Sequence, residues 1–309
     1  MVGKSLFIEE LSVDFMISTG KVRAVDGVSV VFESGKITGL IGESGCGKSV
    51  LGMAILDLLP AYATLNGKID WGEQSLNEYS IRKRKLLGRE IGLIPQSPSE
   101  SLNPSRKVKA HLNEALRPLG LKRQERYKKA EKLLRDFGFN EPKRILKAYP
   151  HELSGGMQQR VLCAIGTACS PEWIIADEPT KGLDSELCKQ VQQTLQSLRI
   201  QGIKSMLVIT HDLQLAEDLC DTIAVMYGGQ IVEMGDVLHH PLHPYTKAFL
   251  DALPKNGLHP ISQINKGVEQ YSKGCCFAAR CLKSRPRCFQ EKPPYKGDKM
   301  HWVRCFDAG

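Results

Sequence analysis

A glycine-rich loop between an apolar run and a helix-like segment constrains this chain more than any other feature. It follows the apolar run 37–41 and fits the pattern G-x-x-x-x-G-K-[S/T] with Gly42, Glu43, Ser44, Gly45, Cys46, Gly47, Lys48 and Ser49. Glycines let successive backbone N–H groups turn toward phosphate oxygens, and the following helix adds its positive N-terminal end. Lys48 would neutralise phosphate charge, and Ser49 would offer its hydroxyl to Mg²⁺. We therefore expect a nucleoside triphosphate to be bound by Gly42, Ser44, Gly45, Cys46, Gly47, Lys48, Ser49 and Val50.

A second apolar run ends in two carboxylates. Residues 173–176 are followed directly by Asp177 and Glu178. Beside a bound triphosphate, Asp177 would hold Mg²⁺, and Glu178 would act as general base toward the attacking water. Alone, the pair would be interpreted as solvated acids at a strand end. The phosphate loop upstream favours the catalytic interpretation.

Apolar runs alternate with helix-like segments along most of the chain. The runs at 6–8, 28–32, 37–41, 91–94, 173–176, 206–210 and 223–226 are short and apolar, as expected of buried strands. Helix-like segments occupy 48–59, 108–116, 124–137, 157–169, 186–198 and 213–219. This alternation predicts an α/β fold with a largely parallel sheet. Residues 6–32 predict an antiparallel sheet before it, and Gly228–Gly229 predicts a hairpin turn.

Composition and charge limit which partners and which cellular compartment we expect for the chain. The formal net charge of its 309 residues is +8, but the basic residues are spread out, so we expect an ordinary solvated surface and no nucleic-acid partner. No apolar run approaches the roughly 18 residues that span a bilayer, and the start lacks a secretory pattern, so we expect a cytosolic chain. Five of the ten cysteines crowd into the last 35 residues, whereas the other five are scattered as buried small hydrophobes usually are.

One further motif separates this chain from other proteins with a phosphate loop. Leu153-Ser154-Gly155-Gly156-Met157-Gln158-Gln159-Arg160 resembles the signature of ABC ATPases, with Met157 where glutamine is usual. Ser154, Gly155 and Gly156 would open a helix and form an anion site at its N-terminus. In ABC proteins this site touches the γ-phosphate of ATP held by a partner subunit. The resemblance therefore implies two ATP·Mg²⁺ sandwiched between two such domains.

Other elements of the ABC pattern follow in order. Gln96, after the run 91–94, matches the glutamine that contacts Mg²⁺ and reports to the membrane subunit. His211 matches the switch histidine, and Asp184 matches the aspartate of the D-loop, although Lys181-Gly182 before it departs from the commoner Thr-Ala. Phe15 falls where the family places an aromatic ring that stacks on adenine, but a phenylalanine in a strand is as often a core residue.

The resemblance covers residues 5–254 and implies the organisation of the chain. We expect an ABC ATPase domain over residues 1–255, with a helical subdomain at about 97–165 that carries the signature, and a cysteine-rich extension over 256–309. The family works as a pair of ATPases, a homologue or a copy, on two membrane permease subunits supplied by a solute-binding protein. We therefore expect the chain at the cytoplasmic face of the inner membrane.

The flanking sequence resembles the ATPases of bacterial peptide and nickel importers. Ser101–Pro104, Tyr149–Glu152 and His243–Thr246 carry this likeness, and residues 143–150 lean slightly toward the nickel importers. In that family the tail can carry four cysteine ligands, and the matching positions are Cys275, Cys281, Cys288 and Cys305, with Cys276 as an extra. Thiolates at such spacing hold zinc or an iron–sulfur cluster, and some tails of this family hold a [4Fe–4S] cluster. A cluster, zinc and free thiols all stay open, while a cytosolic disulfide is disfavoured.

The alternative is an ABC ATPase without a transport role, acting in DNA repair or translation. Such proteins usually carry a long coiled-coil insertion between the nucleotide motifs, or two ATPase domains in one chain. Here each motif occurs once and no such insertion separates them. A regulatory or metal-sensing role of the cysteine tail is a third hypothesis, and the cargo is left open among peptide, nickel and metallophore.

Overall fold

The computed structural model describes residues 3–18, 20–77, 86–183, 185–200, 202–203, 205–252 and 273–308. The chain divides into two compact units. The helical unit comprises Met1–Ser5, Glu33–Ile37 and Leu76–Leu219, and the phosphate-loop unit comprises Leu6–Phe32, Thr38–Ser75 and Cys220–Gly309.

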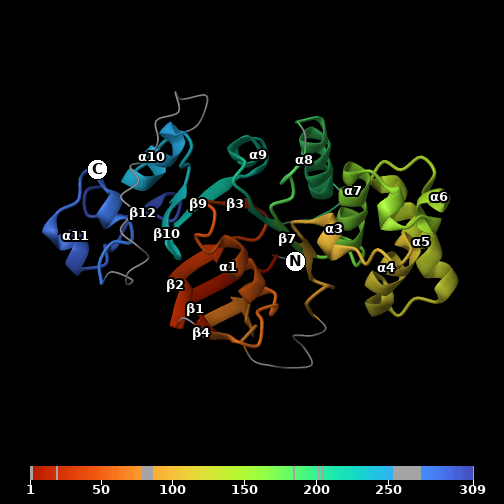
Figure 1. Ribbon diagram of the computed structural model, residues 1–309, viewed down its shortest axis with the longest axis horizontal. Coiled ribbons are helices and arrows are strands. Elements are labelled where there is room, and N and C mark those ends of the chain that lie inside the picture. The colour runs from red at the N-terminus through yellow and green to blue at the C-terminus, as the bar shows by residue number, and fades with distance from the viewer. Residues whose placement is uncertain are drawn as a thin grey trace. The chain divides into compact units, whose positions relative to one another are not determined.

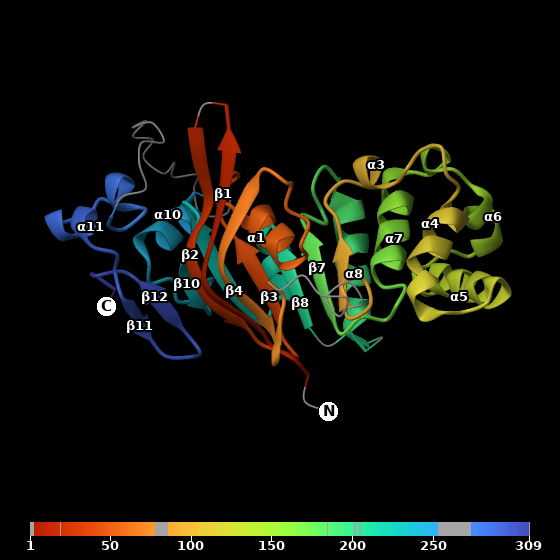
Figure 2. The ribbon, with the colours of Figure 1, turned by 90° about the horizontal axis from the view of Figure 1, so that it is seen from below.

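An antiparallel sheet in the order β2-β1-β4-β5 begins the phosphate-loop unit. Its strands are β1 (Leu6–Ile17), β2 (Gly20–Phe32), β4 (Ala63–Trp71) and β5 (Gln74–Ser75). Strand β1 pairs with β2 on one side and with β4 on the other (Figure 2). In this register Leu6 lies opposite both Phe32 and Trp71. These three side chains are almost completely buried. Because a slip of one residue would turn them to the other face, their burial fixes the register of the sheet.

The same unit holds the strands that frame the phosphate loop. Residues Thr38 to Ile41 of β3 pair in parallel with β9, which turns through Gly228–Gly229 into antiparallel β10, and β12 and β11 continue that sheet (Figure 2). The elements are β3 (Ile37–Ile41), α1 (Lys48–Ile55), β9 (Thr222–Tyr227), β10 (Gln230–Gly235), α10 (Pro244–Asp251), η4 (Ala278–Arg280), α11 (Pro286–Gln290), β11 (Tyr295–Gly297) and β12 (Trp302–Arg304). All of β3 is buried, which explains why its sequence is continuously apolar.

The helical unit combines short parallel strands with a group of helices. Strand β7 lies between β6 and β8 and is parallel to both. Helices α4, α5, α6 and α7, which come between β6 and β7 in the sequence, cluster together (Figure 1). The elements are β6 (Ile91–Ile94), α3 (Pro98–Ser101), α4 (Val108–Ala115), η1 (Arg117–Leu119), α5 (Arg123–Asp136), α6 (Pro142–Lys147), η2 (Pro150–Glu152), α7 (Gly155–Gly166), β7 (Trp173–Asp177), α8 (Ser185–Ile200), β8 (Ser205–Ile209) and α9 (Leu213–Leu219).

The structure confirms the predicted α/β fold with an antiparallel sheet before it. It also confirms the hairpin at Gly228–Gly229, where Tyr227 pairs with Gln230. The helix expected over 48–59 ends earlier, at Ile55, since Asp57 adopts a positive φ of 58° and Pro60 follows. Among the described helices, none has both the length and the apolar character that crossing a bilayer requires.

The organisation of the tail is only partly visible in the described residues. The predicted boundary at residue 255 lies outside them, as does the rest of 253–272. The described part of the tail joins the phosphate-loop unit, because β12 pairs with β10 through Glu233↔Val303 and Met234↔Trp302. Helices α3 to α7, from Pro98 to Gly166, occupy the stretch in which we expected a helical subdomain.

Candidate active site

The phosphate loop lies between β3 and α1, and its conformation requires glycine at two positions. Gly42 has φ 151° and Gly47 has φ 107°. A Cβ atom on Gly42 would overlap the carbonyl oxygen of Met226, and one on Gly47 would overlap that of Ala24. Both neighbouring atoms belong to the backbone and cannot move without shifting a strand, so any side chain at position 42 or 47 would deform the loop.

Lys48 begins helix α1 and is buried in the loop that it follows. Its Nζ donates to the carbonyl oxygens of Gly42 and Glu43, at 2.9 and 3.0 Å. Ser44 and Gly45 are exposed, and Ser49 and Val50 are partly exposed in the first turn of α1. A buried ammonium at a helix N-terminus, beside exposed backbone, forms an anion-binding surface suited to phosphate.

Cys46 contributes a small apolar volume to the loop rather than a charge. It is 7% exposed, and burial raises the pKa of its thiol, which therefore stays protonated near neutral pH. Its carbonyl accepts a hydrogen bond from the N–H of Gly229 at 3.0 Å, so the β9–β10 turn supports the loop.

Phe15 lies in β1 within the same unit as the loop. It pairs with Val22, two residues before Ala24, whose carbonyl abuts Gly47. The Phe15 ring is partly exposed and lies 5.8 Å from the ring of Tyr62. The partly exposed ring of Phe15 and the exposed ring of Tyr62 make a surface on which a nucleobase can stack. Sequence reasoning missed Tyr62, because nothing local in the sequence indicates that β1 and the segment before β4 bring the rings together.

The predicted general base is held in the helical unit by its predicted partner. Glu178, directly after β7, is 8% exposed, and its Oε2 lies 2.6 Å from His211 Nδ1. The backbone N–H of His211 also points at Oε2, at 3.4 Å, and the N–H of Glu178 donates to Ile209 O at 2.8 Å. Glu178 has φ 47°, a left-handed conformation that is costly for a non-glycine residue and that recurs at functional sites.

The remaining candidates of the helical unit lie at the ends of its elements. Asp177 is the last residue of β7, and Gln96 follows β6 after Pro95; both are partly exposed. Ser154 caps α7, and its Oγ accepts a hydrogen bond from Met157 N–H at 3.4 Å. The N-terminus of α7 is open to solvent at Ser154 and Gly155, as an anion site requires. Asp184 lies outside the described residues.

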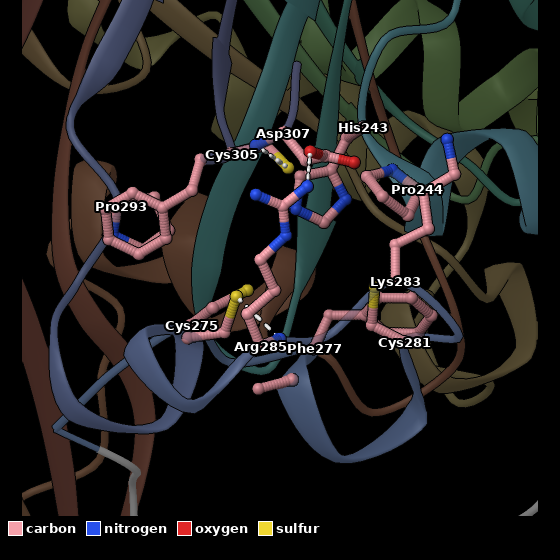
Figure 3. A pocket seen from close by; sticks show the side chains of 13 residues that line it. His243, Pro244, Cys275, Phe277, Cys281, Lys283, Arg285, Pro293, Cys305 and Asp307 are labelled. Atoms are coloured by element: carbon pink, nitrogen blue, oxygen red, sulfur yellow. Dashed lines mark hydrogen bonds and ion pairs between the residues drawn. The ribbon is translucent and has the colours of Figure 1, made fainter.

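A cavity in the tail, which we call the cysteine cavity, is lined by four of the five clustered cysteines: Cys275, Cys281, Cys288 and Cys305. Cys276 is not among its lining residues, and none of these five cysteines is in a disulfide. His243 also lines the cavity; its Nδ1 accepts from Tyr245 N–H at 3.0 Å, while its Nε2 is buried without a hydrogen-bond partner. Figure 3 shows Arg285 extending between the labelled cysteines toward Asp307, to which it donates at 2.6 Å.

The chemistry of the cysteine cavity suits a soft metal, but the side-chain positions do not form a ligand set. Four thiols and an orphaned imidazole nitrogen are groups that zinc or an iron–sulfur cluster would use. Within the described parts of the chain, however, no group of three or more His, Cys, Asp or Glu side chains is arranged to hold a metal ion. Arg285 and Asp307, which form an ion pair, also line the cavity.

Comparisons with known proteins agree on one family. A sequence model described as "ABC transporter" matches residues 25–181, and one described as "Oligopeptide/dipeptide transporter, C-terminal region" matches residues 231–288. The chain is 38% identical over 299 residues to the dipeptide transport ATP-binding protein DppD of Escherichia coli K12, covering 93% of this chain and 91% of DppD. It is 35% identical over 314 residues to the oligopeptide transport ATP-binding protein AppD of Bacillus subtilis 168, covering 97% and 96% of the two chains.

A solved structure shares the fold. The dimeric ATP-binding cassette MJ0796, bound to ADP and Pi after hydrolysis, matches with a TM-score of 0.64 and 25% identity over 73% of this chain and 96% of that chain. The relatives named above are peptide transport proteins, so they give no support to the predicted likeness to nickel importers.

Proposed function

The chain belongs to the ABC transporter family of ATP-binding proteins, and from this premise we propose that it powers an importer of dipeptides or oligopeptides. As an ABC ATPase it uses ATP with Mg²⁺ and hydrolyses ATP to ADP and phosphate. The peptide cargo is supported by the match of residues 231–288 to the C-terminal region of oligopeptide/dipeptide transporters, and by relatives named as dipeptide and oligopeptide transport ATP-binding proteins. The same match disfavours the alternative of an ABC ATPase in DNA repair or translation.

The hydrogen bond between Glu178 and His211 is the observation that most supports a hydrolytic role. A carboxylate fixed at 2.6 Å from an imidazole is oriented to accept a proton from water while the water oxygen attacks the γ-phosphorus. The bond from γ-phosphorus to the bridging oxygen breaks, and ADP departs with that electron pair. His211 donates through its Nδ1–H to the Glu178 carboxylate and so orients the base toward the water.

In the proposed mechanism, Gly42 to Val50 and Lys48 in particular hold the triphosphate, and Phe15 and Tyr62 stack on adenine. Bound Mg²⁺ supplies charge neutralisation of the phosphates, with Ser49, Gln96 and Asp177 as the groups that would hold it. The N-terminus of α7 at Ser154, Gly155 and Gly156, together with Asp184, would complete the site of a second ATPase subunit, a copy or a homologue. The dimeric state of the cassette MJ0796 supports such pairing.

Transport itself requires partners that this chain does not supply. We propose two membrane permease subunits and an extracytoplasmic solute-binding protein, with this ATPase docked at the cytoplasmic face of the inner membrane. Gln96 and the helices that follow it would transmit closure of the ATPase pair to the permeases.

Reconstitution tests the cargo. The chain, its partner ATPase and the permeases are placed in proteoliposomes, and phosphate release is measured with a solute-binding protein loaded with dipeptide, with nickel or with nothing. We expect dipeptide loading to raise turnover several-fold and nickel loading to leave it at the unloaded rate. Stimulation by nickel alone would contradict the peptide assignment and revive the nickel hypothesis.

For the tail, we propose that the four thiols of the cysteine cavity bind a [4Fe–4S] cluster, with zinc and free thiols as the rival outcomes. The gathering of four thiols around one cavity and the buried His243 Nε2 beside them support this. Anaerobically purified protein should contain about four irons per chain. We expect a Cys281→Ala/Cys288→Ala variant to lose the iron and the control Cys276→Ala to keep it. Zinc, or neither metal, in the unaltered protein would contradict the proposal.

A further inference from the structure

The tail reaches the phosphate loop through one arginine. Arg280 ends η4, and its guanidinium donates two hydrogen bonds to the carboxylate of Glu43, at 2.9 Å from Nη1 and 3.2 Å from Nη2. Nη1 also lies 3.2 Å from the hydroxyl of Tyr227. Glu43 is the residue directly after Gly42 in the loop, so a residue from the far end of the sequence is bound to the nucleotide cradle.

Each polar group of Glu43 has a partner. Its N–H donates to the hydroxyl of Tyr245 at 3.0 Å, its carbonyl accepts from Lys48 Nζ at 3.0 Å, and its carboxylate receives Arg280. Tyr245 is fully buried and its pKa is raised by that burial, so its hydroxyl stays protonated and neutral. Glu43 is therefore held by α10, by the tail and by the loop lysine.

The Arg280–Glu43 pair is sheltered enough for its electrostatics to matter. The side chains are 19% and 35% exposed, and Arg280 lies over the rings of Tyr227 and Phe277, with its Cζ atom 5.6 and 6.0 Å from their centroids. A paired, bidentate guanidinium is also geometrically fixed. Without it, the loop that must accept a triphosphate would carry an unpaired carboxylate, which repels phosphate charge through a medium of reduced dielectric.

We propose that Arg280 is a positioning residue for nucleotide binding, acting through Glu43. It neutralises the Glu43 carboxylate and holds it away from the phosphate-binding face of the loop. Docking of the cysteine-rich tail on the loop therefore raises the affinity for ATP. Events in the tail, including occupation of the cysteine cavity next to η4, thereby alter nucleotide binding without touching the nucleotide. The inference rests on the proposed role of the loop as the ATP site.

Titration of the full chain with Mg²⁺ and the fluorescent analogue mant-ATP tests this role. We expect Arg280→Ala to raise the Kd on the order of tenfold, the scale of one unscreened charge near a polyanion. Adding Glu43→Gln to Arg280→Ala should restore the Kd to about twofold of the original, since the repelling charge is gone. The matched control Arg287→Ala removes another tail arginine, whose ion pair with Glu291 stays inside the tail, and should leave the Kd unchanged.

Rescue by Glu43→Gln distinguishes an effect of the Glu43 charge on nucleotide binding from a loss of folding in the tail. If Arg280→Ala binds mant-ATP as tightly as the unaltered chain, the inference is overturned. It is also overturned if Glu43→Gln fails to rescue, because Arg280 would then act only by holding the tail in place. The unaltered chain tests the nucleotide site itself, because a failure of this chain to bind mant-ATP would refute that site as well. If the unaltered chain binds mant-ATP and Arg280→Ala binds it equally well, only the proposed role of Arg280 is refuted.

Discussion

Replacing Glu178 with glutamine is expected to slow ATP hydrolysis by about 10²- to 10⁴-fold, the usual contribution of a general base. Glutamine keeps the size of the side chain and can still hydrogen-bond to His211, but it cannot take a proton from water at neutral pH. Because the phosphate loop is untouched, mant-ATP should bind as tightly as before. Phosphate release under saturating ATP, with the partner subunits present, measures the first effect, and equilibrium titration measures the second.

Glu172→Gln is the matched control for this variant. Glu172 directly precedes β7, at the end opposite Glu178, so the change removes a nearby carboxylate that does not contact His211. We expect near-normal turnover. If Glu178→Gln hydrolysed ATP as fast as the control, another group would have to be the base.

Lys48→Ala should lower the affinity for ATP by about 3 kcal/mol, or roughly a hundredfold, as truncating one partner of a buried charge pair does. Lys48 is 5% exposed, and its ammonium can exchange the carbonyls of Gly42 and Glu43 for phosphate oxygens without leaving the loop. The alanine variant loses that charge, so binding and hydrolysis fall together. Isothermal titration with ATP·Mg²⁺ measures the change.

Lys68→Ala provides the comparison, because Lys68 is an exposed lysine of the same unit paired with Glu9. Its removal should change the affinity for ATP by less than a factor of about two. Equal losses in Lys48→Ala and Lys68→Ala would indicate that general positive charge, and not the loop lysine, attracts the nucleotide.

Much of the fold was predictable because its strands are short, apolar and bounded by turn residues. The run 37–41 becomes β3 with every residue buried, and Gly228–Gly229 forms the predicted hairpin. The phosphate loop was equally predictable, since Gly42 and Gly47 adopt conformations in which any side chain would overlap neighbouring backbone atoms. Such features are local, and a local sequence pattern carries them.

What could not be predicted depends on contacts between distant residues. Arg280 lies 237 positions from Glu43 in the sequence, and the ring of Tyr62 packs near that of Phe15 only because the strands pair. Neither contact can be inferred from a local stretch of sequence. The cysteine tail was predicted as an extension over 256–309, but nothing in the sequence indicated that β12 would pair with β10 or that Arg280 of η4 would contact the loop. The left-handed backbone of Glu178 also escaped prediction, because tertiary context and not propensity enforces it.

The central claim is that ATP is held jointly by the phosphate loop of one subunit and the Ser154–Gly156 helix terminus of another. Light scattering on Glu178→Gln, alone and mixed with its partner ATPase, tests it most directly when combined with a count of bound nucleotide. We predict that ATP·Mg²⁺ produces a pair, with itself or with the partner, that contains two nucleotides and that Ser154→Arg abolishes. Single, nucleotide-loaded chains in both preparations would contradict the account.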